Sequence, residues 1–251
     1  MNVFTCAPDL ESILSCIYVA WSSGSGHKNI RIEAEPIEQL SLFDEYTHVD
    51  KDHAMVQSVI DAVNLKISPS FYSDLAYISM AYEKDVPDLM YRLMLLGFAY
   101  GPGVINNTCY EVVVRFHEIK KRLSNEACRF KEVARFHEVR NSLYVAHIEP
   151  KSRIVITLGP AFSDRMPSEN WMVIDDVHRE AVIHPKNSPF YLRTLTEDEF
   201  NDLLLTEKEN DEYTDLWKIF FESIAIKERE NLKLQRSLFP LWTRKHAVEF
   251  T

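Results

Sequence analysis

The stretch with the strongest strand character, residues 135–179, reads RFHEVRNSLYVAHIEPKSRIVITLGPAFSDRMPSENWMVIDDVHR. Apolar residues alternate along Leu143–Ile148, and again at Ile154, Ile156 and Leu158. A period of two with β-branched residues predicts strands. The segment Glu149-Pro150-Lys151-Ser152 lies between them and predicts a turn, because proline presets φ for the first corner of a type I turn. The pattern therefore predicts a β-hairpin.

A second pair of strands is predicted directly afterwards. Trp171–Asp175 and Ala181–His184 are apolar runs, and the polar corner Asp176–Arg179 separates them. Two successive hairpins predict a small antiparallel sheet over about residues 142–184. Short strands near Asn2 and Ile30 are further candidates for this sheet.

The rest of the chain has helical periodicity, so the expected fold class is α+β and mostly helical. Ser68-Pro69 predicts a helix start, since proline suits the first helical position, and Gly97 predicts the end of a later helix. A long C-terminal amphipathic helix is expected from an apolar stripe with the rhythm i, i+3, i+4, i+7. This stripe, expected to be buried, consists of Tyr213, Leu216, Trp217, Phe220, Phe221, Ile224 and Ala225.

We expect a single domain over residues 1–251. The alternative sub-division places residues 36–140 in a helical part, and residues 1–35 together with 141–251 in a sheet-containing part. No apolar run reaches the ~20 residues that a membrane-spanning helix needs, and the N-terminus lacks the pattern of a signal peptide. Four cysteines without a CxxC pair favour free thiols in a reducing compartment. We therefore expect a cytoplasmic protein.

The net charge of −10 is unevenly distributed. Nine acidic residues lie between Thr196 and Asp215. Two segments are basic: Val112–Arg140 has eight Lys or Arg against four Glu, and Lys227–His246 has six against two. A local basic face can bind phosphate whatever the total charge, because screening confines the interaction to ~8 Å. The alternative is that both segments are solvated helix faces.

Sequence motifs give no cofactor and no metal site. The chain contains no radical-SAM CxxxCxxC, no P-loop and no HExxH motif. His147-Ile148-Glu149 matches the first half of the zinc-deaminase pattern, but no PCxxC follows it.

Several segments resemble a bacterial family of uncharacterised proteins described as "probable DNA metabolism protein". The resemblance is carried by RFHEV, LYVAHIEP, AFSDRMP and NWMVIDDVHR within residues 135–179, by LESILSCIYVAWSS near the start, and by LWKIFFESIAIKERENLKLQRSLFP near the end. It implies association with a radical-SAM protein of DNA modification or repair, beside which members are typically encoded. Some relatives are fused to a domain of the uracil-DNA glycosylase superfamily.

The resemblance also implies a set of candidate residues. By position in the family's motifs they are Arg135, Phe136, Tyr144, Glu149, Arg165, Trp171, Arg179, Arg229, Asn231 and Gln235. After Pro240, where the family usually has a basic-aromatic pair, this chain has Leu241-Trp242-Thr243.

Residue chemistry separates these candidates into two roles. Arginine binds phosphate through two parallel hydrogen bonds, and Asn or Gln can contact a base edge. The candidates for nucleic-acid or phosphate binding are Arg135, Arg165, Arg179, Arg229, Asn231, Lys233, Gln235 and Arg236. The candidate general acids or bases are Glu149, Asp175 and Asp176. The alternative is structural, with Arg179 paired to Asp175 and Arg165 to Glu169.

Three functions remain open on these grounds. The first is an accessory protein of a bacterial DNA modification or repair system, which binds nucleic acid or its radical-SAM and glycosylase partners. The second is an enzyme acting on a nucleobase or nucleotide, with a carboxylate general acid or base and arginine phosphate clamps. The third is a structural adaptor. The first leads, with Arg165, Arg179, Arg229 and Asn231 expected near one another.

Overall fold

The computed structural model describes residues 1–37, 39–139, 142–206, 219–220, 223 and 231–247. The chain divides into two compact units, Met1–Leu123 and Ser124–Thr251. Helix α5 (Glu111–Val133) begins in the first unit and ends in the second. Within the described ranges, none of the helices combines the length and apolarity needed to cross a bilayer.

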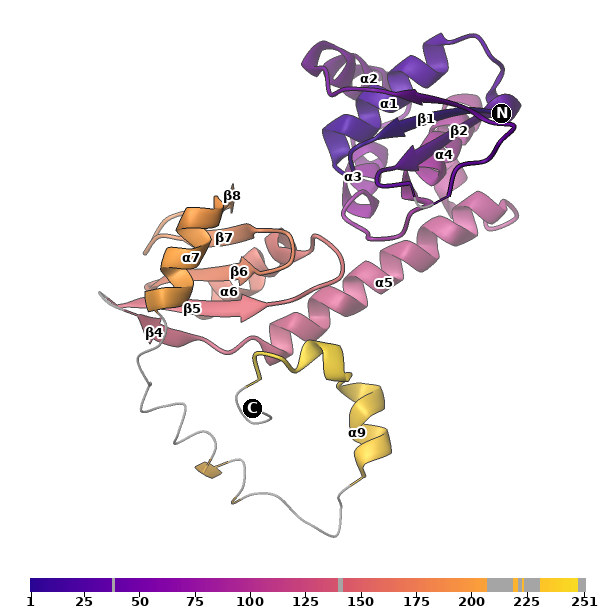
Figure 1. Ribbon diagram of the computed structural model, residues 1–251. Coiled ribbons are helices and arrows are strands. Elements are labelled where there is room, and N and C mark those ends of the chain that lie inside the picture. The colour runs from indigo at the N-terminus through magenta and orange to yellow at the C-terminus, as the bar shows by residue number, and fades with distance from the viewer. Residues whose placement is uncertain (38, 140–141, 207–218, 221–222, 224–230, 248–251) are drawn as a thin grey trace. The chain divides into compact units, whose positions relative to one another are not determined.

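The first unit is built on a parallel three-stranded sheet in the order β2-β1-β3 (Figure 1). Its elements are β1 (Asn2–Cys6), α1 (Leu10–Ser22), η1 (His27–Asn29), β2 (Ile30–Ala34), β3 (Glu45–His48), α2 (His53–Lys66), α3 (Pro69–Ile78), α4 (Val86–Tyr100) and η2 (Pro102–Asn106). The predicted strands near Asn2 and Ile30 therefore exist, but they pair with each other and not with the strands of residues 142–184.

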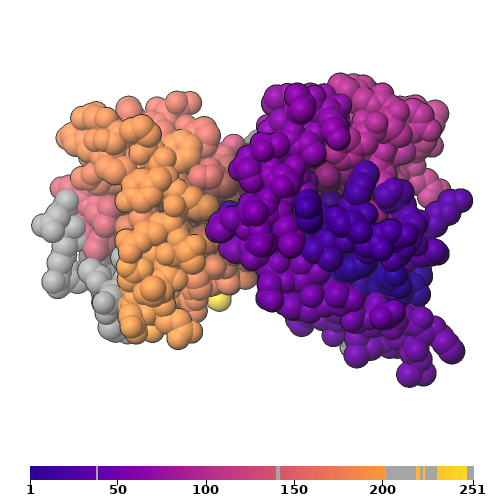
Figure 2. All heavy atoms as spheres, turned by 90° about the horizontal axis from the view of Figure 1, so that it is seen from above, coloured from indigo at the N-terminus to yellow at the C-terminus, as the bar shows by residue number. Residues whose placement is uncertain are grey.

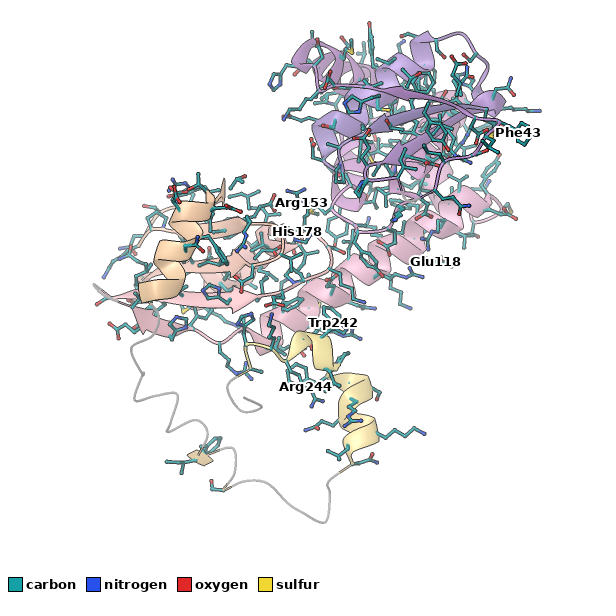
Figure 3. All side chains as sticks on the ribbon, viewed as in Figure 1. Phe43, Glu118, Arg153, His178, Trp242 and Arg244 are labelled. Carbon is teal, nitrogen blue, oxygen red and sulfur yellow. The ribbon has the colours of Figure 1, made fainter. Side chains whose placement is uncertain are left out.

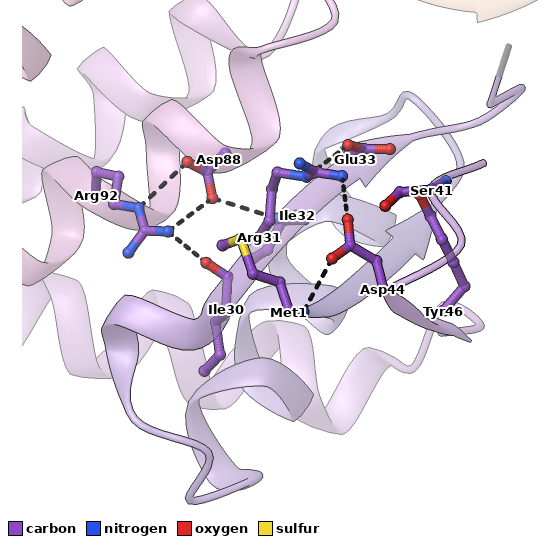
Figure 4. A network of polar contacts seen from close by, with 10 residues as sticks. All are labelled: Met1, Ile30, Arg31, Ile32, Glu33, Ser41, Asp44, Tyr46, Asp88 and Arg92. Carbon is purple, nitrogen blue, oxygen red and sulfur yellow. Dashed lines mark hydrogen bonds and ion pairs between the residues drawn. The ribbon is translucent and has the colours of Figure 1, made fainter. Parts of the chain in front are cut away.

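Helix α4 caps the free edge of β2 (Figure 4). Asp88 accepts a hydrogen bond of 3.2 Å from the Ile32 amide, and Arg92 donates to the Ile30 carbonyl. Arg92 also pairs with Asp88 one helical turn away. These side chains satisfy backbone groups that an edge strand would otherwise expose.

The second unit contains a five-stranded mixed sheet in the order β4-β5-β6-β7-β8. Its elements are the end of α5, β4 (His137–Val139), β5 (Leu143–Ile148), η3 (Val155–Leu158), α6 (Gly159–Arg165), β6 (Asn170–Asp175), β7 (Glu180–His184), β8 (Tyr191–Thr194), α7 (Glu197–Thr206), α9 (Leu232–Leu238) and η5 (Leu241–Thr243).

Helices cover both faces of this sheet. On one face, Phe200 of α7 packs against Val145, Ile174 and Ala181. On the other face, Trp171 is fully buried against Phe162 of α6. Edge strand β8 is exposed along its whole length. The orange surface in Figure 2 belongs to the part of the chain that contains β8 and α7.

The predicted small antiparallel sheet of two hairpins is wrong, because the first hairpin does not form. Residues 155–158 form the 3-10 helix η3, and β5 pairs in parallel with β6. The burial pattern explains the error. Ile154, Val155 and Leu158 are fully buried, and this spacing is helical. The apolar residues at 154, 156 and 158 also alternate, so the sequence resembles a strand. Residues 149–169 then supply the crossover that parallel strands require. Strands β6 and β7 do pair as an antiparallel hairpin.

The predicted long C-terminal helix is also wrong. The described residues there contain α9, which spans seven residues. Asn231 is its N-cap, with φ −140° and ψ 88°, and its side chain accepts from the Leu234 amide at 3.0 Å. An N-cap with this non-helical backbone interrupts any helix that would run through it. Phe220 is 51% exposed, so its predicted burial is wrong; Trp217, Phe221 and Ile224 lie outside the described residues.

Gly97 does not end its helix, since α4 continues to Tyr100. A Cβ at this position would lie 2.7 Å from Ile67 Cδ1 and 2.9 Å from Phe71 Cζ. Glycine is therefore needed here for close packing of α4 against neighbouring residues.

We predict that Gly97→Ala destabilises the protein although alanine is the better helix former. Overpacking costs about 1–3 kcal/mol, against roughly 1 kcal/mol gained in helix propensity. Gly103→Ala is the matched control, because a Cβ there meets nothing within 4 Å. Thermal unfolding of both variants checks the prediction, and a midpoint for Gly97→Ala at or above that of Gly103→Ala would contradict it.

Candidate functional site

The carboxyl ends of β5 and β6 bring two of the candidate acids together. The strands run in parallel with Ile148 opposite Asp175. The Asp176 amide donates to the Ile148 carbonyl at 3.0 Å, which extends the pairing by one residue. Glu149 and Asp176 each follow the last residue of a strand. The parallel register therefore places these two carboxylates at the same edge of the sheet.

Two histidines join these carboxylates in a cluster of four side chains. His246 Nε2 lies 3.2 Å from Glu149 Oε1 and 3.2 Å from Asp176 Oδ2. His147 Nδ1 lies 2.6 Å from the other Asp176 oxygen, Oδ1. His147, within β5, is buried, whereas the side chain of His246 is 33% exposed. The cluster therefore has a buried end at His147 and an accessible end at His246 and Glu149.

The histidines stabilise the ionised form of Asp176. Burial alone would raise its pKa, but the hydrogen bonds from His147 and His246 outweigh burial and hold the pKa of this carboxyl below its ordinary value. A carboxylate held ionised in this way is a weak base but a suitable partner for a positively charged group.

Lys245 supplies a positive charge beside Glu149. Its Nζ lies 2.5 Å from Glu149 Oε1, and this contact raises the pKa of the ammonium group. The Lys245 side chain is 67% exposed, so it can leave Glu149 without exposing buried surface.

Glu126 of α5 holds the corner that follows β5. It is buried, and its Oε1 accepts from the Lys151 amide at 2.6 Å and from the Ser152 amide at 3.2 Å. The predicted turn at residues 149–152 is thus fixed by a helix carboxylate and not by a hairpin partner. Glu126 positions Glu149 indirectly, through the backbone that follows it.

An open groove of about 690 Å³ begins at Glu149. Its lining combines apolar residues with cations: Pro150, Lys151, Val177, Leu241, Trp242, Arg244 and Lys245. Trp242 and Arg244 belong to the segment after α9 (Figure 3). Lys151 Nζ lies 5.1 Å from the centroid of the Trp242 ring, and Arg244 donates to the Phe239 carbonyl.

Asp175, the third candidate acid, has a structural role. It is fully buried and accepts from the Val177 and His178 amides at 3.0 Å each, and from His178 Nδ1 at 2.6 Å. These bonds shape the β6–β7 corner, in which Arg179 has a positive φ of 56°. Asp175 therefore holds the turn and leaves Asp176 as the acid of this corner that contacts the cluster.

The candidate arginines contact different parts of the second unit. Arg135 donates to the Glu132 carbonyl, and Arg165 donates to the Lys131 carbonyl and lies over the Phe162 ring. Arg179 lies 3.6 Å from the centroid of the Phe200 ring. Neither predicted pairing, Arg179 with Asp175 or Arg165 with Glu169, occurs as an ion pair among the described residues.

The C-terminal candidates separate into structural and exposed residues. Asn231 caps α9, and Gln235 accepts from Arg244 Nη1 at 3.3 Å. Lys233 and Arg236 are exposed on α9. Arg229 lies outside the described residues. Within the described ranges, no hydrogen bond or ion pair joins Arg165, Arg179 and Asn231.

Sequence reasoning missed His147, His246, Lys245, Trp242 and Glu126. A usable signal existed for His147, since it belongs to a His-x-Glu segment that matches the first half of the zinc-deaminase pattern. His246 carried no local pattern, because its contacts are 97 residues away in sequence. Glu126 has the appearance of any polar residue on an amphipathic helix.

Comparison with known proteins identifies a family. A family model described as a domain of unknown function, DUF4130, matches residues 84–249, and no curated protein matches the chain. The matched range includes every residue of the cluster and of the groove.

We predict that Glu126→Ala destabilises the second unit by about 1–3 kcal/mol, because it leaves the Lys151 and Ser152 amides without their acceptor. Glu126→Gln retains an acceptor oxygen and is the matched control, with a smaller loss. Urea unfolding of both variants checks this. Equal losses for Ala and Gln would show that the hydrogen bonds are not the cause.

Proposed function

We propose a function for this chain, which belongs to the DUF4130 family. The proposal is that it is a cytosolic enzyme of bacterial DNA metabolism acting on a nucleotide or nucleobase. One observation carries the proposal: Glu149 and Asp176, at the ends of two parallel strands, converge on His246, and Glu149 also lines the groove. Carboxylates and histidines gathered beside a groove are typical of catalytic sites.

The groove has features that suit a nucleotide. Trp242 and Leu241 offer apolar surface on which a base can stack, and such stacking contributes about 1–3 kcal/mol per base. Lys151 and Lys245 place ammonium groups along the same groove, where a phosphate can bind. Leu241 and Trp242, which stand where the resembling family usually has a basic-aromatic pair, thus line the groove. In this proposal lysines replace the predicted arginine clamps.

The cluster supplies acid–base chemistry next to the groove. Asp176 is kept ionised by two histidines, and His246 contacts both carboxylates. A positioned group that takes a proton from water or from substrate contributes typically ~10²–10⁴-fold to the rate. His147, on the buried side, orients Asp176 through its 2.6 Å contact.

The assignment to DNA metabolism rests on the resemblance of residues 135–179 and of the C-terminal motif to the family encoded beside a radical-SAM protein. The same resemblance supports a second candidate, an accessory role that binds this radical-SAM protein, a glycosylase partner or DNA. The observation in its favour is the exposure of Lys233 and Arg236 on α9.

The enzyme hypothesis predicts conversion of at least one member of a panel of deoxynucleotides and short 5′-phosphorylated DNA strands, measured by chromatography of the products. Asp176→Asn should lower turnover by roughly 10²-fold or more, because the amide removes the negative charge that His147 and His246 contact. Trp242→Ala should weaken substrate binding about 5- to 150-fold, the equivalent of ~1–3 kcal/mol.

The matched control for Trp242 is Tyr191→Ala, since Tyr191 is a 48% exposed aromatic residue on β8, outside the groove. The variant should retain wild-type turnover. A panel on which the wild-type protein shows no conversion and no binding would contradict the enzyme hypothesis. Full activity of Asp176→Asn would contradict the assignment of the site.

The accessory hypothesis predicts co-purification with the neighbouring radical-SAM protein, tested with and without DNA. If Lys233 and Arg236 contact phosphates, replacing both with alanine should flatten the slope of log K against log salt by roughly one to two units. An unchanged slope would exclude phosphate contacts by these residues. Retention of the partner without any DNA binding would favour a structural adaptor.

A further inference from the structure

We infer that Glu149, Asp176 and His246 form a binding site for a divalent transition-metal ion. The inference deepens the proposed function, on which the catalytic use of the ion rests, whereas binding of the ion can be measured without any substrate. No sequence motif indicated this site, because its three ligands come from the end of β5, the end of β6 and the segment after η5.

The three donor atoms have the spacing that an ion requires. One oxygen of Glu149, one oxygen of Asp176 and a nitrogen of His246 lie within 4.8 Å of one another, and His246 Nε2 is 3.2 Å from each oxygen. Ligands bound at about 2.0–2.2 Å to one ion stand roughly 3.0–3.4 Å apart. The two contacts of His246 already fall in this range, so closure of the site needs only a small approach of the two carboxylates.

The chemical surroundings favour a metal cation between Glu149, Asp176 and His246 over a single proton shared by these three groups. Two carboxylates face a single histidine nitrogen, which has at most one proton to donate to them. Asp176 uses its other oxygen to accept from His147, which fixes the orientation of the carboxylate and leaves Oδ2 directed at the site. Such outer contacts are usual around metal ligands and tune the affinity of the site.

The Lys245 ammonium contacts the Glu149 carboxylate, which is one of the three proposed ligands. The ammonium lies 2.5 Å from the Glu149 oxygen that also faces His246. An ion and this ammonium would compete for the same oxygen. Because Lys245 is 67% exposed, it can move to solvent or to a substrate phosphate in the groove when an ion binds.

The donor set selects the kind of ion. Two carboxylates and one imidazole suit Mn²⁺, Fe²⁺ or Zn²⁺, whereas Ca²⁺ takes about 6–8 oxygen ligands. Three protein ligands leave coordination positions open beside the groove. A water or a phosphate oxygen of the substrate can occupy them, so we expect the substrate class to be a phosphate ester.

Titration of the chelator-treated full chain with Mn²⁺ alone, followed by the electron paramagnetic resonance signal of free Mn²⁺, tests this inference. We expect one ion bound per chain. Glu149→Gln and Asp176→Ala should each weaken binding by more than tenfold. His147→Ala should weaken it about 10- to 100-fold, because the outer contact to Asp176 is lost.

Two variants distinguish a metal site from general loss of structure. Lys245→Ala removes the competing ammonium and should strengthen Mn²⁺ binding, which unfolding would not do. His178→Gln alters a histidine that pairs with Asp175, outside the three-ligand group, and should leave binding unchanged. Circular dichroism confirms the fold of each variant.

Absence of stoichiometric binding by the wild-type chain would overturn the inference. Equal Mn²⁺ affinity in wild type, Glu149→Gln and Asp176→Ala would also overturn it, as would weaker binding by Lys245→Ala. Failure of the proposed function is separate: Mn²⁺ bound by these ligands in a protein that converts no nucleotide supports the site and contradicts the enzyme.

Discussion

The parallel pairing of β5 with β6 is the constraint on which the candidate site depends. With Ile148 opposite Asp175, the next residue of each strand, Glu149 and Asp176, emerges at the same edge. A shift of the register by one residue would move these carboxylates apart and reverse the faces of the strand. The buried side chains oppose such a shift: Val145 faces α7 with Ile174, while Trp171 faces α6.

The site also depends on groups distant in sequence that hold the two strand ends. Glu126 of α5 binds the amides after β5, and Asp175 binds those after β6. The C-terminal segment then brings His246 and Trp242 to the prepared edge. The groups of the candidate site thus come from both the sheet and a terminal segment.

Part of the fold was predictable because local chemistry determines it. The Ser68 cap, the β6–β7 hairpin and the strands near Asn2 and Ile30 follow from capping, turn residues and alternation. Residues 154–158 were not predictable, since a short apolar run fits both a strand and a helical turn. Glu149 and Asp176 were recognised as acids, but their meeting requires a parallel register that no local pattern encodes. His246 could not be assigned, because it gains its role only through the tertiary fold.

The most direct test of this account is the set of nuclear Overhauser effects across β5 in the labelled full chain. Parallel pairing predicts a contact between the Ile148 amide proton and the Hα of Asp175, together with equivalent contacts from the Ala146 and Tyr144 amide protons to the Hα of Val173 and Trp171. The hairpin alternative predicts close contacts between β5 and residues 154–158 instead. Observation of the second pattern without the first would contradict the parallel pairing and, with it, the site.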